Sequence, residues 1–141
     1  MYQRPIYENA ASLSNEAEAK EIIEKQWQCN LHKLPRSLHM DWMATRNGKG
    51  VGFVEFKRRS NLVNKYPTIF ISVLKLVAAQ KLYSATALTS YWVIGWTDCY
   101  GHISLNSHPD RVEMGGRADR NDPADHEPMA HYEINKVTLW T

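Results

Sequence analysis

This 141-residue sequence has few cysteines, a small net charge and no recognisable secretion signal. The two cysteines, Cys29 and Cys99, are too few for a disulfide framework and lack the spacing of a metal-binding motif, so a reducing compartment is expected. The first twenty residues contain no apolar segment of the kind that directs secretion. A net charge of only +2 means that any surface for nucleic acid must come from local clustering of basic residues.

A long uninterrupted apolar run is also missing. The longest such stretch, residues 68–88, is broken by Lys75, Gln80 and Lys81, which argues against a membrane span. Hydrophobic residues make up 43% of the chain and aromatic residues 11%, and this composition excludes a disordered protein. We therefore expect one soluble cytoplasmic domain over residues 1–141.

Hydrophobic periodicity and turn signals divide the chain into helices and strands. The apolar stripe of the first helix and the caps Ser12 or Ser14 mark its start, and Pro67 is suited to the first turn of a second helix. That second helix is apolar around most of its circumference, which predicts a buried core helix. The predicted order is a helix over 12–26, strands over 27–34, 38–45 and 51–59, a helix over 68–85, a strand over 91–97, a turn near 100–101 leading into HISLN, a loop over 109–128 and a strand over 131–140.

The third strand contains the most informative pattern in the sequence. Residues 51–57 read VGFVEFK, and because a strand alternates its side chains between faces, Glu55 and Lys57 must point to the same side. The turn signal RNGKG over 46–50 predicts a hairpin that brings the region of Asp41 across from Glu55. Two carboxylates at close range favour a cation between them, and hard oxygen ligands suit Mg²⁺ or Mn²⁺. A surface ion pair on an amphipathic strand is the alternative.

These residues resemble the motif of the PD-(D/E)xK nuclease superfamily, with Asp41 in MDW and Glu55-Phe56-Lys57 as the E-x-K element. Met40 stands where the superfamily has its proline. The runs HKLP, YPTIFIS and GGRADRNDP are also similar to small phage-encoded members. The resemblance implies a restriction-endonuclease-like α/β fold, with an αβββαβ core over about residues 12–97, a mixed central sheet flanked by helices, and an appended C-terminal β region over about 98–141.

The resemblance also implies roles for individual residues. Asp41 and Glu55 would bind Mg²⁺ or Mn²⁺ with the backbone carbonyl of Phe56, and Lys57 would act on the water or the phosphate. A glutamate from the first helix often joins such sites, and Glu18 is the preferred candidate among four. The other three are Glu16, Glu21 and Glu24. Lys75 on the second helix is the expected accessory residue, with a snorkelling surface lysine as an equal alternative.

Basic residues gather around the E-x-K strand. They would contact a phosphate backbone without reading its sequence. Simple solvation of the strand exit by the two arginines after Lys57 is the alternative. The expected DNA-binding residues are Arg46, Lys49, Arg58, Arg59, Lys65 and Lys75.

Two weaker motifs carry no prediction. The loop DRNDPAD over 119–125 superficially resembles a calcium loop, but Pro123 stands where a central glycine is needed. Gly115 and Gly116 indicate a turn rather than a phosphate-binding loop, because no strand-to-helix context surrounds them.

The combined interpretation is a Mg²⁺-dependent DNA nuclease, either an endonuclease or an exonuclease, in phage DNA metabolism within the bacterial cytoplasm. So small a core favours recognition of DNA structure, such as a junction, flap or end, and many structure-selective superfamily members act as homodimers. The alternatives are a catalytically inactive nucleic-acid-binding protein of the same fold and a structural phage protein.

Overall fold

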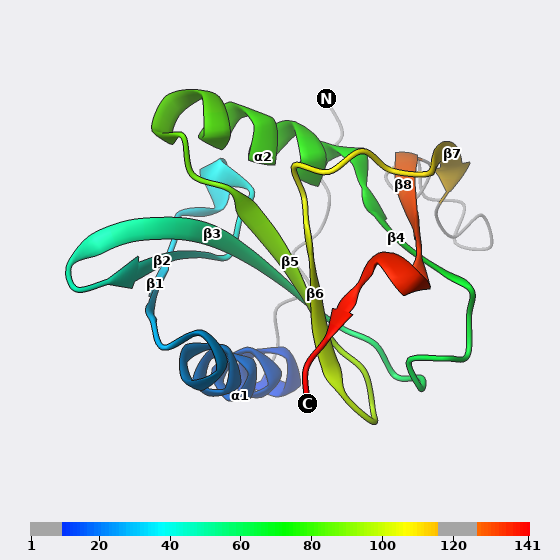
Figure 1. Cartoon of the computed structure of the whole chain (residues 1–141), viewed down its shortest axis with the longest axis horizontal. Coiled ribbons are helices and arrows are strands. Elements are labelled where there is room, and N and C mark those ends of the chain that lie inside the picture. The colour runs from blue at the N-terminus through cyan, green and yellow to red at the C-terminus, as the bar shows by residue number, and fades with distance from the viewer. Residues whose placement is uncertain (1–9, 116–126) are drawn as a thin grey trace.

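The computed structural model describes residues 10–115 and 127–141 (Figure 1). Within these residues, nine β-strands form two sheets, and there are two α-helices. Short 3₁₀ helices cover Arg36–Leu38 and Ile134–Lys136. The longer elements are α1 (Ala10–Trp27), β1 (Asn30–Lys33), β2 (Trp42–Arg46), β3 (Lys49–Arg58), β4 (Thr68–Ser72), α2 (Val73–Thr86), β5 (Ser90–Gly95), β6 (Tyr100–Ser104), β7 (Arg111–Gly115), β8 (Glu127–Glu133) and β9 (Thr138–Leu139).

The larger sheet is mixed and has the strand order β1-β2-β3-β5-β6-β9. Only β3 and β5 run parallel; the other neighbours are antiparallel. A parallel pair requires a crossover connection, and here β4 and α2 lie within it. In keeping with their central position, five of the six residues of β5 and four consecutive residues of β3, Gly52 to Glu55, are buried.

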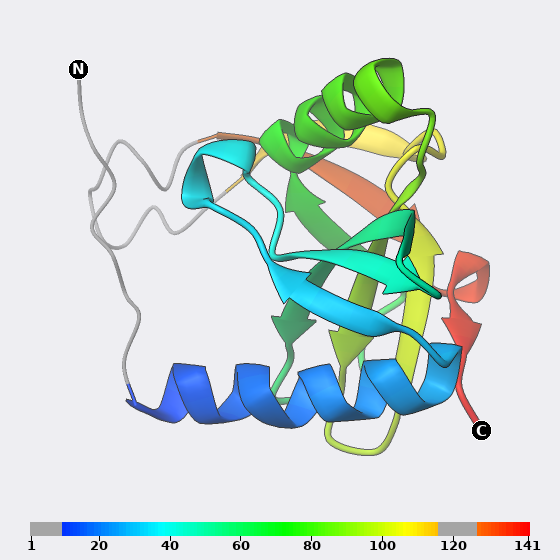
Figure 2. The ribbon, with the colours of Figure 1, turned by 90° about the vertical axis from the view of Figure 1, so that its left-hand side faces the viewer.

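The two helices cover opposite faces of this sheet (Figures 1 and 2). Ala19 and Ile23 of α1 pack in one apolar cluster with Val54 of β3. Ala78 and Ala79 of α2 belong to the other cluster, which includes Phe53, the neighbour of Val54 along β3. Alternate residues of β3 therefore face α1 and α2 in turn.

The hairpin turn predicted over 46–50 is confirmed. Asn47 and Gly48 have φ angles of 53° and 77°, and Arg46 pairs with Lys49 across the turn. Positive φ at both central positions is the geometry of a two-residue turn that matches strand twist. This local signal fixes how β2 and β3 align.

The N-terminal boundaries differ from those expected. The first helix spans Ala10–Trp27, so Ser12 and Ser14 lie inside it and do not cap it. Because the helix continues to Trp27, β1 shortens to Asn30–Lys33.

The predicted second helix is wrong over its first five residues, which form β4. Ile69 and Ile71 are buried while Phe70 is exposed, a period-two pattern, and β4 pairs with β8 in the smaller sheet of order β4-β8-β7. Ser72 then caps α2, its Oγ accepting a hydrogen bond from Leu74 N at 3.2 Å. Pro67 therefore precedes a strand rather than opening a helix.

The expectation that the second helix is fully buried is also wrong. Leu74, Val77 and Tyr83 are 60%, 43% and 46% exposed, and within α2 the fully buried residues are Ala78 and Ala79. The helix lies on one face of the sheet, so its apolar circumference exceeds what that face can cover. No helix in the described part of the chain is both long and apolar enough to cross a membrane.

The C-terminal region contains more strand than expected. Residues 111–115 of the predicted loop form β7, and β6 begins at Tyr100, where a turn was expected. The predicted strand over 131–140 is interrupted at Ile134–Lys136, because the chain passes there from the smaller sheet to β9 at the edge of the larger one. Residues 116–126, which include the calcium-loop-like run and Gly116, lie outside the described residues.

Candidate active site

The β2–β3 hairpin brings Asp41 and Glu55 together. Trp42 pairs with Val54, so Asp41, one residue earlier, lies beside the next residue of β3. The Oδ2 atom of Asp41 accepts a hydrogen bond from the backbone N–H of Phe56 at 2.8 Å. This bond fixes the Asp41 carboxylate at the edge of β3, where the E-x-K element begins.

Glu55 is a buried carboxylate with two cationic neighbours. Its exposed fraction is 1%. Its Oε2 atom lies 3.5 Å from Nζ of Lys57 and 3.2 Å from Nζ of Lys75. The Oε1 atom is buried and has no hydrogen-bond partner in the described part of the chain. This burial contradicts the alternative of a surface ion pair.

The electrostatic balance at Glu55 favours a proton or a further cation. Burial raises the pKa of the Glu55 carboxyl, and the charge of Asp41 raises it further, whereas Lys57 and Lys75 lower it. The net direction is upward. A buried acid with a nearby second acid is typical of a site whose ionised form is completed by a bound cation.

Lys75 reaches the site from the first turn of α2. Its Nζ atom donates a hydrogen bond to the backbone oxygen of His39 at 3.0 Å while pairing with Glu55. The Lys75 side chain is 23% exposed and that of Lys57 is 42% exposed. The sequence offered no signal for the His39 carbonyl, because its position depends on the loop between β1 and β2.

Glu18 lies elsewhere. Its Oε1 atom is 3.9 Å from Nη2 of Arg58, and Arg58 also donates a hydrogen bond to the hydroxyl of Tyr100 at 2.8 Å. Arg58 and Phe56 project from the α1 side of β3, opposite to Glu55. The structure therefore does not bring Glu18 into contact with Glu55.

None of the other three glutamates of α1 has a contact with Glu55 among the described residues. Glu16 pairs with Lys33 at the end of β1, and Glu24 accepts a hydrogen bond from Leu31 N at 2.8 Å. Glu21 is exposed.

The expected basic cluster is split between distant parts of the fold. Arg46 and Lys49 flank the hairpin turn, at the opposite end of β2 from Asp41 and roughly 15 Å from it along the strand. Arg46 donates hydrogen bonds to the backbone oxygens of Trp27 and Gln28 at 2.7 and 3.1 Å. The expectation that these two residues lie near the carboxylates is wrong, because a hairpin places its turn away from its open end.

Two other basic residues follow the E-x-K strand. Arg59 donates a hydrogen bond to the Phe70 backbone oxygen at 3.2 Å, and burial lowers the pKa of its guanidinium. The Nζ atom of Lys65 lies 5.6 Å from the centre of the Tyr66 ring.

Trp92 of β5 is a further neighbour of the site. It is the parallel-register partner of Glu55 and is fully buried. Its indole N–H has no hydrogen-bond partner in the described ranges. No sequence signal could have identified it, because the pairing joins strands that are separated by α2.

The candidate ligands of a divalent cation are few. No group of three or more His, Cys, Asp or Glu side chains within residues 10–115 and 127–141 could hold a metal ion. Two carboxylates do lie close enough to influence each other, however, and one oxygen of Glu55 is buried without a hydrogen-bond partner among the described residues. This set fits Mg²⁺, which binds through one or two carboxylates and keeps several waters.

Comparison with known proteins adds a family and a fold. A family model described as "Phage putative PDDEXK endonuclease" matches residues 2–139. No curated protein matches the chain in sequence. The structure of a Holliday junction resolvase from the archaeal hyperthermophile Archaeoglobus fulgidus is similar, with a TM-score of 0.53 at 10% identity over 85% of this chain and 84% of that chain. The predicted restriction-endonuclease-like fold is confirmed.

Proposed function

The chain belongs to the family of phage putative PDDEXK endonucleases, and we propose that it is a divalent-metal-dependent nuclease that hydrolyses phosphodiester bonds in DNA. The observation that carries this proposal is the burial of Glu55 beside Asp41, with Lys57 on the same face. Burying a charge is costly unless it is paired or binds a cation, and titratable groups that are gathered at such a cost are typical of functional sites. Here two acids and two lysines lie together.

The proposed metal ligands are the carboxylates of Asp41 and Glu55 and the backbone carbonyl of Phe56. A divalent cation held by these groups would supply Lewis-acid polarisation of the phosphate and would make the attacking water more acidic. The Phe56 N–H holds the Asp41 carboxylate in place, so its orientation does not have to be set when the cation binds.

Lys57 is the residue proposed to orient the attacking water and to stabilise the negative charge that develops on the phosphate. Its Nζ atom lies beside Glu55 yet its side chain is 42% exposed, so it can reach a phosphate that approaches from solvent. Water attacks phosphorus and gives up a proton to solvent, the bond from phosphorus to the leaving oxygen breaks, and that oxygen takes a proton from solvent. Lys75 is the proposed positioning residue, since it holds Glu55 from the other side.

We further propose that the substrate is branched DNA in phage DNA metabolism within the host cytoplasm. The support is the similarity of fold to a Holliday junction resolvase. A four-way junction has paired strands to cut, so a homodimer is the assembly that fits it best. Arg59 and Lys65 follow the E-x-K strand in the chain. We propose that they contact the phosphate backbone of the DNA.

The test is cleavage of four-way junction, flap, linear and supercoiled DNA in Mg²⁺, Mn²⁺ or EDTA. Wild type is expected to cut with either cation and not in EDTA, whereas Glu55→Gln and Lys57→Ala are expected to lose about 100-fold or more in rate. Matched controls are Glu133→Gln, an exposed acid on β8, and Lys81→Ala, an exposed lysine on α2. Absence of cleavage by wild type, or equal cutting by the site variants, contradicts the proposal.

The same experiment separates the nuclease from a catalytically inactive nucleic-acid-binding protein. If no protein cuts but wild type retains DNA in EDTA as well as in Mg²⁺, the fold serves as a nucleic-acid-binding module. Light scattering with and without a four-way junction measures the proposed dimer directly.

A further inference from the structure

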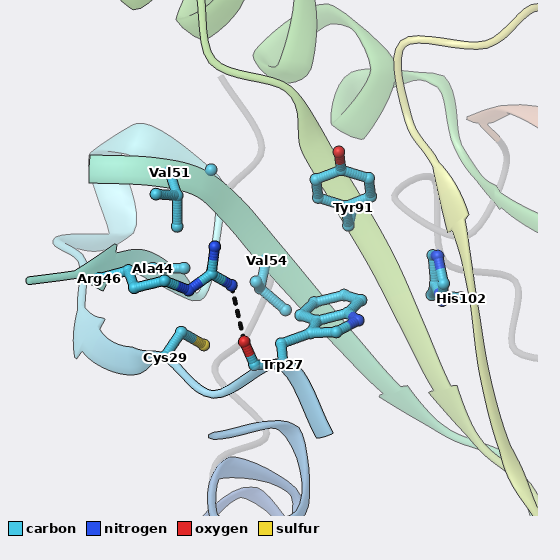
Figure 3. Close-up of a pocket in the computed structure, with 9 residues that line it drawn as sticks. Trp27, Cys29, Ala44, Arg46, Val51, Val54, Tyr91 and His102 are labelled. Carbon is cyan, nitrogen blue, oxygen red and sulfur yellow. Dashed lines mark hydrogen bonds between the residues drawn. The ribbon is translucent and has the colours of Figure 1, made fainter. Parts of the chain in front are cut away.

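A pocket of about 260 Å³ is lined by residues from the end of α1 and from four strands of the larger sheet (Figure 3). Val54, which belongs to the apolar cluster under α1, forms part of its wall, and Arg46 beside the hairpin turn forms another part. Because Glu55 projects to the α2 face, this pocket is separate from the proposed catalytic site.

Aromatic rings form one side of the pocket. The ring centres of Trp27 and Tyr91 lie 5.5 Å apart at an angle of 59°, and Trp27 meets His102 edge to face at 5.1 Å. The rings of Trp27 and Tyr91 meet at an angle and lie too close together for a third ring to enter between them. A planar ligand can pack against the corner, as nucleic-acid bases do on aromatic platforms.

Arg46 supplies the charge. A guanidinium has five N–H groups, and the hydrogen bonds of Arg46 within the described ranges engage one at Nε and one at Nη2. The remaining donors are free for an anion, and bidentate binding of phosphate is the contact that arginine favours. None of the nine described residues that line the pocket is acidic. The pocket therefore has the electrostatics of an anion site.

His102 supplies a neutral donor. The indole N–H of Trp140 donates a hydrogen bond to Nδ1 of His102 at 2.8 Å. An indole nitrogen can only donate, so Nδ1 must carry the lone pair and the neutral ring keeps its proton on Nε2. Burial lowers the pKa of His102, which favours this neutral form. Each nucleobase offers acceptor atoms for such a donor.

The volume limits the ligand to something small. An engineered cavity of about 150 Å³ holds benzene, and pockets for drug-sized molecules begin near about 300 Å³. A volume of about 260 Å³ lies between these values and suits one base with part of its sugar. We propose that this pocket binds a single nucleotide, with the base against Trp27 and Tyr91 and the phosphate at Arg46.

The nucleotide has two sources, a free mononucleotide or an unpaired nucleotide in a DNA strand. The test follows the indole N–H signal of Trp27 by NMR during titration with dAMP, with deoxyadenosine and with short single-stranded oligo(dA). The protein carries Glu55→Gln and the buffer contains EDTA, so the result does not depend on cleavage or on a metal. The Trp27 signal is assigned by its loss in Trp27→Phe.

A saturable shift with dAMP that is weaker with deoxyadenosine is the expected result. Ala44→Leu, which fills the pocket from β2, should abolish the shift, and Arg46→Gln or Tyr91→Leu should weaken binding by about tenfold. Tyr83→Leu, an exposed tyrosine on α2, is the matched control and should bind like the parent. Urea unfolding of each variant identifies any that fail to fold.

The two sources predict different affinities. Binding of oligo(dA) tighter than dAMP assigns the pocket to an unpaired nucleotide of a strand, and equal binding per nucleotide assigns it to a free nucleotide. The proposal is overturned if neither dAMP nor oligo(dA) gives a saturable shift. It is also overturned if folded Ala44→Leu still binds dAMP, or if deoxyadenosine binds as tightly as dAMP.

Discussion

The ammonium nitrogen of Lys75 lies 3.2 Å from Oε2 of Glu55, so α2 supplies a cation to a carboxylate that β3 buries. The second cation, Lys57, comes from the same strand as Glu55 and is more exposed. The ion pair between Lys75 and Glu55 therefore links α2 to the proposed metal site. It also means that Glu55 depends on two different elements for its ionised form.

Lys75→Met is expected to destabilise the fold by about 1–2 kcal/mol, because Glu55 would remain buried with only Lys57 beside it. Urea unfolding measures the loss. Lys81→Met on the exposed face of α2 is the matched control. The double variant with Glu55→Gln should recover part of the loss, since the buried charge is then gone. Equal stability of Lys75→Met and wild type would rule out this role.

Asp41 has two roles that two substitutions can separate. Asp41→Asn keeps an acceptor for the Phe56 N–H, so its stability should stay close to wild type while Mn²⁺ affinity falls, because a charged ligand is lost. Asp41→Ala should lower Mn²⁺ affinity too, and should also cost about 1–3 kcal/mol because the Phe56 N–H loses its partner. Calorimetric titration gives the affinity and urea unfolding the stability. Unchanged Mn²⁺ binding in both variants would remove Asp41 from the ligand set.

Gly48→Ala tests the hairpin turn that aligns Asp41 with Glu55. The φ angle of Gly48 is 77°, and a Cβ there would meet no atom within 4 Å, so the expected cost of about 1–2 kcal/mol comes from the backbone alone. Asn47→Gly is the matched control, because φ at Asn47 is also positive and glycine accepts it. Thermal unfolding compares the two. A Gly48→Ala protein as stable as wild type would show that the turn adopts another geometry.

Asp110 is expected to give a pH-dependent contribution to stability. A hydrogen bond from Lys136 and another from the Glu133 N–H lower the pKa of its carboxyl. The contribution is therefore complete above the unfolded pKa of about 3.9 and is lost as the pH falls through the lower, folded pKa. At about pH 7, Asp110→Asn should unfold at a lower urea concentration than wild type. This difference should vanish near about pH 2. Glu133→Gln is the control, and a difference that persists in acid would contradict the assignment.

The sequence predicted the elements whose signals are local. The Asn47-Gly48 turn, the alternation along 51–57 and the apolar stripe of the first helix each need only a few adjacent residues, and all three are present. It failed at residues 68–72, where a short apolar run reads equally well as helix or strand. Only pairing with β8, about sixty residues away in the chain, decides that this segment is a strand.

The candidate site divides in the same way. By itself the sequence determined that Glu55 and Lys57 share one face and that a hairpin carries Asp41 towards them, because strand periodicity and turn geometry are local properties. Tertiary structure alone decided that Lys75 reaches Glu55, that Glu18 pairs with Arg58 on the other face, and that Arg46 lies at the far end of the hairpin. These positions depend on which face of the sheet each helix covers, and packing of the whole core selects that face.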